Sequence, residues 1–497
     1  MDTIIKTKDW AAGRIKEDEI KKYMDNGRDF IDDSGIIEKL KLNKTAEPSR
    51  IMEILKKSLA VETLTPDETA LLLNVDDKDM LDEMEKTAAE VKRKVYDNRI
   101  VTFAPLYLGN KCVNNCFYCG FRSENDSSSR RVLEFNEVKK EIEVLTGKIG
   151  HKRLVVVYGE HPSMDIDYMT GSIKAIYSVS VQTKKGHSEI RRVNVNAPPL
   201  SVSELRKLKE AGIGTYQVFQ ETYNRQTYAN VHPVNTIKGN YRWRLYSMHR
   251  AMEAGVDDVG IGVLFGLHDW RFEVMGLLYH AIELEKKFGI GPHTISFPRL
   301  EPAENTPFTK NNQNSVSDED FKKLITVIRL SVPYTGMIIT ARETRALRKE
   351  SFRLGVTQTD ASSRIGIGAY SEGNTCQEGK KQQFFLGDTR SLDEVIKELA
   401  EMGYITSFCT AGYRCGRTGL KIMDLLRTGT EGKFCKQNAV LTFREWLDDF
   451  ASPQTLEIGE KLISKEIEEI KTRIPKFYGE FINYYDRVKS GERDIYV

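Results

Sequence analysis

VTFAPLY, residues 101–107, leads within a few residues into CVNNCFYC, residues 112–119, and this junction decides the fold. The first segment is apolar and rich in strand-forming residues, so we expect a buried strand. The second has the spacing C-x3-C-x2-C, which places three thiols within eight positions of one loop. Reactive loops that directly follow a buried strand are typical of the catalytic end of an α/β barrel.

The same strand pattern recurs along the chain. Short apolar runs alternate with helical stretches, such as those at 203–211, 241–254, 274–288 and 318–330. This alternation predicts parallel strands joined by helices. We expect eight strands, at 101–107, 154–158, 192–196, 215–220, 258–265, 294–297, 336–341 and 355–358. Eight units favour a closed (β/α)8 barrel over an open sheet, because closure leaves no strand edge unpaired.

Helical patterns flank the predicted barrel on both sides. Residues 1–90 are charged and helical in pattern, and Thr65, Pro66 and Glu68 predict a helix start with Thr65 as the N-cap. Beyond residue 370 the βα rhythm ends, and we expect helices at 392–402, 465–473 and 477–489. We therefore predict an N-terminal helical extension (1–90), a barrel (91–370) and a C-terminal helical domain (371–497).

The composition is that of a globular protein of the cytoplasm. Hydrophobic residues make up 40% of the 497 residues, and 74 Lys and Arg nearly balance 72 Asp and Glu, which gives no electrostatic case for nucleic acid or a membrane surface. The first residues lack a signal-peptide pattern, and no apolar run reaches the ~18 residues that span a bilayer. Seven cysteines, an odd number, argue for metal ligation rather than disulfides.

The cysteine loop is the strongest chemical signal. Three thiolates on one loop can bind three irons of a [4Fe–4S] cluster, which leaves the fourth iron open to a small molecule. Zinc is the alternative, but a structural zinc site takes four protein ligands. No fourth Cys or His is close in sequence, since His151 is the nearest His. We therefore predict an iron–sulfur cluster on Cys112, Cys116 and Cys119.

Polar side chains also follow other predicted strands. Glu160 follows the second strand, Asn196 ends the third, Glu221 follows the fourth and Arg342 follows the seventh. Comparable positions after the sixth, seventh and eighth strands hold Arg299, Glu343, Ser363 and Arg364. One charged residue at a strand end is usually a solvated rim residue. Several such ends meet at one mouth of a barrel, so we expect a joint site.

These motifs resemble the radical SAM superfamily, whose members bind S-adenosylmethionine (SAM) at a cluster on such a loop. The approach PLY (105–107) to the first cysteine is similar to that of the aromatic amino acid lyases HydG and ThiH. Longer stretches resemble HydG in particular, over roughly residues 95–450. They are GIGTYQVFQET (212–222), DDVGIGVLFGL (257–267), GPHTISFPRL (291–300), VPYTGMI (332–338) and SFCTAGYRCGRTG (407–419).

The resemblance implies a tyrosine lyase of [FeFe]-hydrogenase maturation. In that family the 5′-deoxyadenosyl radical made from SAM breaks the Cα–Cβ bond of L-tyrosine, which gives p-cresol and dehydroglycine. Arg342 would then pair with the tyrosine carboxylate. The residues implied at SAM are Tyr118, Gly159, Glu160, Asn196, Glu221 and Arg244, of which Glu221 is also a catalytic candidate. Tyr118 and Phe117 would pack on the adenine or only within the loop. An electron donor such as flavodoxin or ferredoxin is the implied partner.

The C-terminal segment departs from the HydG pattern. HydG binds a second cluster with C-x2-C-x22-C in a domain of the biotin- and thiamin-synthesis type. Here Cys409 and Cys435 hold the outer positions, Gly412 the middle one, and Cys415 is additional. Glu283 stands where HydG has a His ligand of the dangling iron of that site. Either Cys409, Cys415 and Cys435 form a rearranged auxiliary cluster, or the site is lost and with it CO and cyanide formation. The two changes favour loss.

The sequence leaves three alternative functions open. A ThiH-like 2-iminoacetate synthase of thiamine biosynthesis shares the cleavage and lacks the auxiliary cluster. A lyase for another aromatic amino acid, such as tryptophan, would keep the same radical chemistry. A non-catalytic Fe–S scaffold would bind iron without cleaving SAM, and the polar strand ends argue against it. Cys376 has no partner at ligand spacing, so we expect it to be structural.

Overall fold

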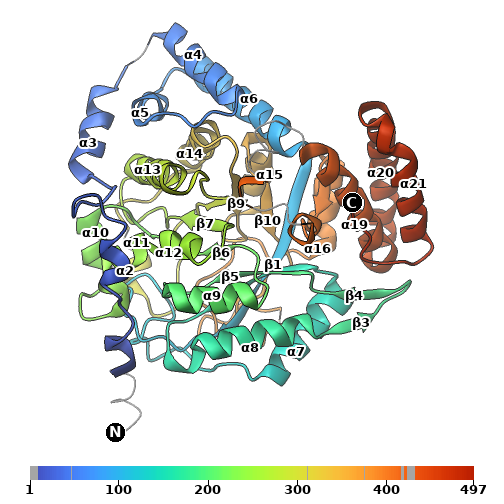
Figure 1. Ribbon diagram of the computed structural model, residues 1–497, viewed down its shortest axis with the longest axis horizontal. Helices are drawn as coiled ribbons and strands as arrows, with labels where there is room; N and C mark the ends of the chain where they lie inside the picture. The colour runs from blue at the N-terminus through green and yellow to red at the C-terminus, as the bar shows by residue number, and fades with distance from the viewer. Residues whose placement is uncertain (1–8, 46, 311, 374, 416–418, 422–430) are drawn as a thin grey trace.

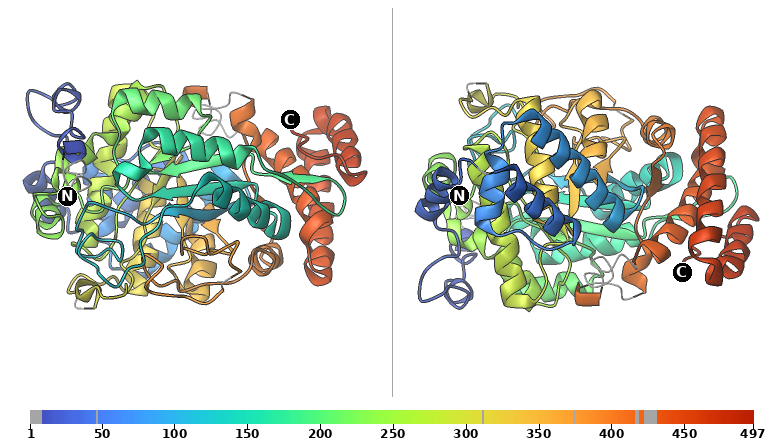
Figure 2. Two further views of the ribbon diagram at one scale, coloured as in Figure 1. Left: turned by 90° about the horizontal axis from the view of Figure 1, so that it is seen from below. Right: turned by 90° about the horizontal axis from the view of Figure 1, so that it is seen from above.

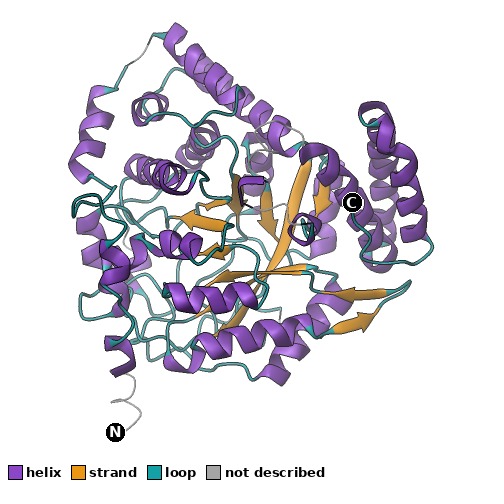
Figure 3. Cartoon of the chain, in the orientation of Figure 1, coloured by secondary structure: helices purple, strands orange, loops and turns teal. Residues whose placement is uncertain are grey.

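A closed parallel barrel wrapped by helices forms the centre of the molecule (Figure 1, Figure 3). The computed structural model of the chain describes residues 9–45, 47–310, 312–373, 375–415, 419–421 and 431–497. Within this part of the chain, no helix is both long and apolar enough to cross a membrane.

Eight parallel strands make the barrel, in the order β10-β9-β8-β7-β6-β5-β2-β1, and β10 pairs with β1 to close it. They are β1 (Arg99–Gly109), β2 (Arg153–Tyr158), β5 (Arg192–Asn196), β6 (Tyr216–Gln217), β7 (Val259–Gly262), β8 (Thr294–Ser296), β9 (Gly336–Ile339) and β10 (Gln358–Asp360). Helices cover the outside and side chains fill the inside, so these strands are buried on both faces. The predicted barrel is confirmed.

Some strands differ from the prediction. The eighth strand was expected at 355–358, but β10 begins only at Gln358. Gly355 ends the preceding helix with φ 140°, a backbone conformation that excludes it from a strand. Three short strands were not expected: β3 (Ser180–Gln182) and β4 (His187–Glu189) form a hairpin, and β11 (Ile405–Ser407) pairs in parallel with the start of β1. Strands of three residues show too little periodicity to predict.

The helices form three groups along the chain. The N-terminal group is α2 (Asp18–Lys21), α3 (Asp33–Leu42), α4 (Pro48–Leu59), α5 (Pro66–Leu73) and α6 (Lys78–Tyr96). The barrel group is α7 (Phe135–Val144), α8 (Ile166–Tyr177), α9 (Val202–Glu210), α10 (Arg225–Val231), α11 (Tyr241–Leu245), α12 (Ser247–Glu253), α13 (Trp270–Phe288), α14 (Asp318–Ser331) and α15 (Arg345–Leu354). The C-terminal group is α16 (Leu392–Glu401), α17 (Ala411–Arg414), α19 (Glu431–Phe450), α20 (Pro453–Arg473) and α21 (Pro475–Lys489). The helix expected at 241–254 is divided in two at Tyr246.

The N-terminal and C-terminal helices cover different parts of the barrel and meet where α6 ends beside α19. The N-terminal helices cover α13 and α14, whereas α19, α20 and α21 form a layer at the far end of the longest axis (Figure 1, Figure 2). The start of α5 is capped as predicted, because the Thr65 side chain accepts from the Glu68 N–H and the Glu68 carboxylate accepts from the Thr65 N–H. The division of the chain at residues 90 and 370 stays a prediction.

A buried charge cluster fastens the C-terminal layer to the barrel. Glu445 of α19 is fully buried, and its Oε2 lies 3.3 Å from Lys152 Nζ and 2.9 Å from Arg191 Nη2, next to the starts of β2 and β5. Burial acts to raise the pKa of Glu445, but Arg191 and Lys152 outweigh it and lower the pKa to about 2. Glu445 therefore stays ionised between the two cations.

Candidate active site

A cavity of about 240 Å³ reaches from the carboxyl ends of the strands into the barrel. Its wall contains ten residues predicted from the sequence: Cys112, Cys116, Tyr118, Cys119, Gly159, Glu160, Asn196, Glu221, Arg244 and Arg342. They come from the ends of different strands and from the loops and helix that follow them. The structure thus brings together the side chains that the sequence placed separately at strand ends.

The three cysteines of the loop are free thiols on the wall of this cavity. Desolvation raises the pKa of Cys112, and burial raises that of Cys116 to about 12, so these thiols need a bound cation to lose their protons. In the described part of the chain, no group of three Cys, His, Asp or Glu side chains is placed so that it could hold a single metal ion. Three thiols on one cavity wall suit a cubane cluster, in which each thiolate binds a different iron.

The end of β2 holds the cysteine loop in place. The Val113 N–H donates to the Glu160 carbonyl (2.8 Å), and Asn114 Nδ2 donates to Glu160 Oε2 (2.6 Å). Gly159 is needed for this close approach, because a Cβ there would lie 2.3 Å from the Lys111 carbonyl oxygen. Burial raises the pKa of Glu160, and the hydrogen bond from Asn114 partly opposes that rise. Gly159 and Glu160 therefore shape the loop as well as the cavity.

Glu221 is held between two cations. Its Oε1 lies 2.8 Å from Lys238 Nζ and 3.3 Å from Arg244 Nη2. Burial acts to raise the pKa of Glu221, but Lys238 and Arg244 lower it overall, so the carboxylate is ionised. Its backbone has φ 72°, which a residue with a side chain adopts only under strain and which is common at functional sites. Glu221 lies four residues after β6 ends, and it lines the cavity.

Arg342 lines the cavity three residues after β9 ends and is fixed by two contacts. Its guanidinium is 3.3 Å from the ring centroid of Phe384, and its Nη1 donates to the Arg299 carbonyl (3.4 Å). Desolvation lowers its pKa from the ordinary value, yet arginine stays charged. Burial and nearby Glu343 raise the pKa of Glu301, which also faces Arg342, to about 7. A charged, stacked guanidinium in a cavity wall is suited to a carboxylate ligand.

The other predicted side chains divide between the cavity and the surface. Tyr118 is buried in the cavity wall, and its hydroxyl lies 2.8 Å from His232 Nε2, whereas its neighbour Phe117 is 42% exposed. Of these two residues, Tyr118 is therefore the one that can pack on a ligand in this cavity. Arg299 and Glu343 form an ion pair with each other, so neither is available as a separate ligand group.

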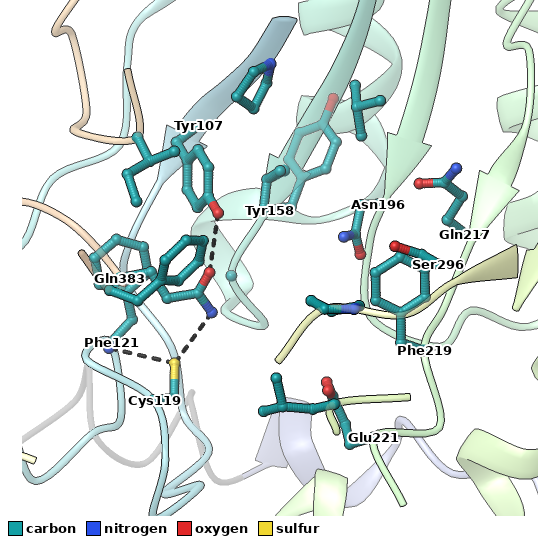
Figure 4. Close-up of a pocket in the computed structure, with 18 of the residues that line it drawn as sticks. Tyr107, Cys119, Phe121, Tyr158, Asn196, Gln217, Phe219, Glu221, Ser296 and Gln383 are labelled. Carbon is teal, nitrogen blue, oxygen red and sulfur yellow. Dashed lines mark hydrogen bonds between the residues drawn. The ribbon is translucent and has the colours of Figure 1, made fainter. Parts of the chain in front are cut away.

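Four residues of the site were missed by the sequence analysis. Asn114 lies inside the cysteine motif, and its amide nitrogen is 3.8 Å from Cys112 Sγ. Lys238 binds Glu221, and Tyr107 and Gln383 line the cavity beside Cys119 (Figure 4). Asn114 could have been predicted from the sequence, because an amide side chain within a metal-binding loop commonly hydrogen-bonds a metal ligand. Lys238 and Gln383 lie in loops without a motif and could not have been predicted in this way.

The C-terminal cysteines lie at the other end of the barrel. Cys409 follows β11, which pairs with the first residues of β1, and lies near Arg153 at the start of β2. Val101 and Gly109 of β1 are roughly 26 Å apart, at ~3.3 Å per residue, so these cysteines cannot share a cluster with the first loop. Cys415 Sγ lies 3.9 Å from the Val497 carbonyl, and Cys435 is in α19. Part of the connecting segment, 416–418 and 422–430, is outside the described residues.

Two further predictions concern single residues. Glu283 lies on α13 with its Oε1 3.6 Å from Nε2 of the buried His249, beside a cavity under the N-terminal helices. Cys376 was expected to be structural, but it is exposed in the loop that follows the barrel. Cys376 is therefore not part of the buried core, and a structural role within its loop stays a prediction.

Two family descriptions match the chain. The radical SAM superfamily matches residues 106–276, and the biotin and thiamin synthesis associated domain matches residues 296–405. The curated 2-iminoacetate synthase of Escherichia coli (strain K12) is 27% identical over 351 residues, which are 70% of this chain and 88% of that protein.

Two solved structures are similar over nearly the whole chain. A crystal structure of HydG, a maturase of the [FeFe]-hydrogenase, is 46% identical with a TM-score of 0.89, and the match covers 94% of this chain and all of that one. HydG from Carboxydothermus hydrogenoformans is 36% identical with a TM-score of 0.77, over 96% of this chain and 99% of that one.

Proposed function

Because this chain belongs to the HydG family of the radical SAM superfamily, we propose that it cleaves the Cα–Cβ bond of L-tyrosine to give p-cresol and dehydroglycine. A [4Fe–4S] cluster with SAM, when bound, supplies the 5′-deoxyadenosyl radical for this reaction. The chain supplies orientation and shielding, and no side chain needs to act as a nucleophile. A one-electron donor such as flavodoxin or ferredoxin is the partner that we propose.

The cavity contains groups that are complementary to SAM and to L-tyrosine. Cys112, Cys116 and Cys119 would hold the cluster, and Glu160 and Glu221 are carboxylates for the positively charged groups of SAM. Tyr118, Gly159, Asn196 and Arg244 complete the side of the cavity that we assign to SAM. The apolar part of the wall includes Phe103, Val155 and Ile338. Such a wall would keep water away from a radical.

The observation that carries the tyrosine proposal is Arg342. Arg342 lines the cavity after the end of β9, and its stacking on Phe384 fixes the plane of the guanidinium. A planar guanidinium binds a carboxylate through two parallel hydrogen bonds. An amino acid held there would have its side chain in the same cavity, whose wall includes the apolar residues Phe103, Val155 and Ile338. Arg342 is thus the proposed substrate residue, with Glu221 as a second catalytic candidate.

We propose that this chain differs from a hydrogenase maturase in what happens to dehydroglycine. Gly412 has no side chain and cannot bind iron, and Glu283 offers a carboxylate where HydG has an imidazole. We propose that dehydroglycine leaves the enzyme and hydrolyses to glyoxylate and ammonium. The same observation favours a second candidate, a 2-iminoacetate synthase of the ThiH type, which releases the same product for thiamine synthesis.

One anaerobic incubation tests the proposal. Purified protein with reconstituted iron and sulfide, SAM, dithionite and L-tyrosine should form 5′-deoxyadenosine and p-cresol in equal amounts. Parallel incubations with L-tryptophan and L-phenylalanine test the other aromatic substrates. 5′-Deoxyadenosine without p-cresol would overturn the tyrosine assignment, and stoichiometric CO captured by a haem protein would overturn the loss of the auxiliary chemistry. A carrier without activity would bind iron and leave SAM intact.

A further inference from the structure

The loop that follows the barrel closes over the cysteine loop. The Gly120 N–H donates to the Gln383 carbonyl (3.2 Å), and the Ser129 N–H donates to the Lys380 carbonyl (2.9 Å). Gly120 has to be a glycine here, since a Cβ would lie 2.5 Å from the Gln383 carbonyl oxygen. Residues 380–383 and 119–129 are therefore in direct contact, although more than 250 positions separate them in sequence.

This contact brings a side-chain amide to a cysteine sulfur. Gln383 Nε2 lies 3.3 Å from Cys119 Sγ, and the Phe121 N–H is 3.4 Å from the same sulfur (Figure 4). On the other side of the amide, the Tyr107 hydroxyl donates to Gln383 Oε1 at 3.0 Å. A metal-bound thiolate can only accept hydrogen bonds. The amide must then present its NH2 to the sulfur and its oxygen to Tyr107, so the phenol fixes the orientation of the amide.

We propose that Gln383 is a positioning residue that raises the reduction potential of the cluster through its hydrogen bond to Cys119, with Tyr107 setting the direction of that bond. The proposal rests on the cluster assigned above. Reduction adds negative charge to a cluster and its sulfurs, and an N–H donor stabilises that charge. Removing the donor therefore makes the cluster harder to reduce and shifts its midpoint potential to a lower value.

The same segment also contacts the proposed substrate residue. Phe384, next to Gln383, stacks on Arg342, and both side chains line the cavity. A carboxylate bound to Arg342 would thereby lie next to the segment that carries Gln383. Two consecutive residues, Phe384 and Gln383, thus contact Arg342 of the proposed substrate site and Cys119 of the cysteine loop.

The experiment is a redox titration of the reconstituted cluster followed by EPR of its reduced form, in the absence of SAM and substrate. Gln383→Leu removes the donor, and Gln383→Glu keeps the acceptor for Tyr107 while replacing the NH2. Both should lower the midpoint potential with the iron content unchanged. Tyr107→Phe should lower it less, because the amide remains but loses its fixed orientation. Gln382→Leu is the matched control and should leave the potential unchanged, since Gln382 bonds Gln377 and the Phe384 carbonyl instead of a sulfur.

The outcomes separate this inference from the proposed function. An unchanged midpoint in both Gln383 variants, with wild-type iron content, overturns the inference and leaves the lyase assignment intact. If the Gln383 variants do not hold a cluster, Tyr107→Phe decides, and an unchanged midpoint there also overturns the inference. A wild-type protein that binds no cluster overturns the proposed function and this inference together.

Discussion

Replacing Arg342 by lysine is the sharpest test of the tyrosine site. One of the five N–H groups of Arg342 points to the Arg299 carbonyl, and stacking on Phe384 leaves a fork of N–H groups for a carboxylate. Lysine keeps the charge but loses one of two charge-assisted hydrogen bonds, about 1.5–3 kcal/mol, and the ring contact, about 0.5–1 kcal/mol. The total of about 2–4 kcal/mol corresponds to a fall in kcat/KM for tyrosine of about 30- to 1000-fold.

The assay is the initial rate of p-cresol formation as a function of tyrosine concentration under anaerobic conditions. Arg345→Lys is the matched control, because Arg345 lies three residues further on, is largely exposed and pairs with Glu398. Its kcat/KM should be that of the wild type. Formation of 5′-deoxyadenosine without tyrosine should be unaffected by Arg342→Lys, since the substitution leaves the cluster loop intact. A kcat/KM within threefold of the wild type, or an equal loss of uncoupled 5′-deoxyadenosine, would refute the assignment of Arg342.

Three further predictions concern the framework of the site. Glu445→Leu leaves the buried Lys152 without its carboxylate and leaves Arg191 paired with Asp494 alone, so the free energy of unfolding measured in urea should fall by about 3–5 kcal/mol at neutral pH. The stabilisation by Glu445 is complete above the ordinary glutamate pKa of 4.5 and is lost as the pH falls towards 2, so the difference from the wild type should shrink in acid. Gly159→Ala should reduce bound iron, because its Cβ would collide with the Lys111 carbonyl, whereas Gly479→Ala meets open space and should bind iron normally. Removing both Cys409 and Cys435 should leave about four irons per chain, as in the wild type, and a drop from about eight would instead demonstrate a second cluster.

The barrel could be predicted because each βα unit carries its own local signals. A run such as LVVVY at 154–158 indicates a buried strand without knowledge of its neighbours. The strand ends then meet by topology alone, which is why Glu160, Glu221 and Arg342 were found. The contacts between loops could not be predicted in the same way. Lys238 reaches Glu221 and Gln383 reaches Cys119 only after distant loops have packed together, and β11 depends on a pairing with β1 across some 300 residues.

The contacts of the cysteine loop also determine when a cluster can be installed during biosynthesis. Its backbone N–H groups donate hydrogen bonds to the carbonyls of Glu160, Val231 and Gln383. Its Asn114 side chain accepts a hydrogen bond from the Lys238 N–H. All four partners are translated later than the cysteines, and the last of them follows the closing strand β10. A nascent chain that ends before Gln383 thus exposes three thiols that lack part of their supporting shell. Cluster insertion should therefore follow completion of the barrel, and assembly factors would meet a folded apoprotein rather than a growing chain.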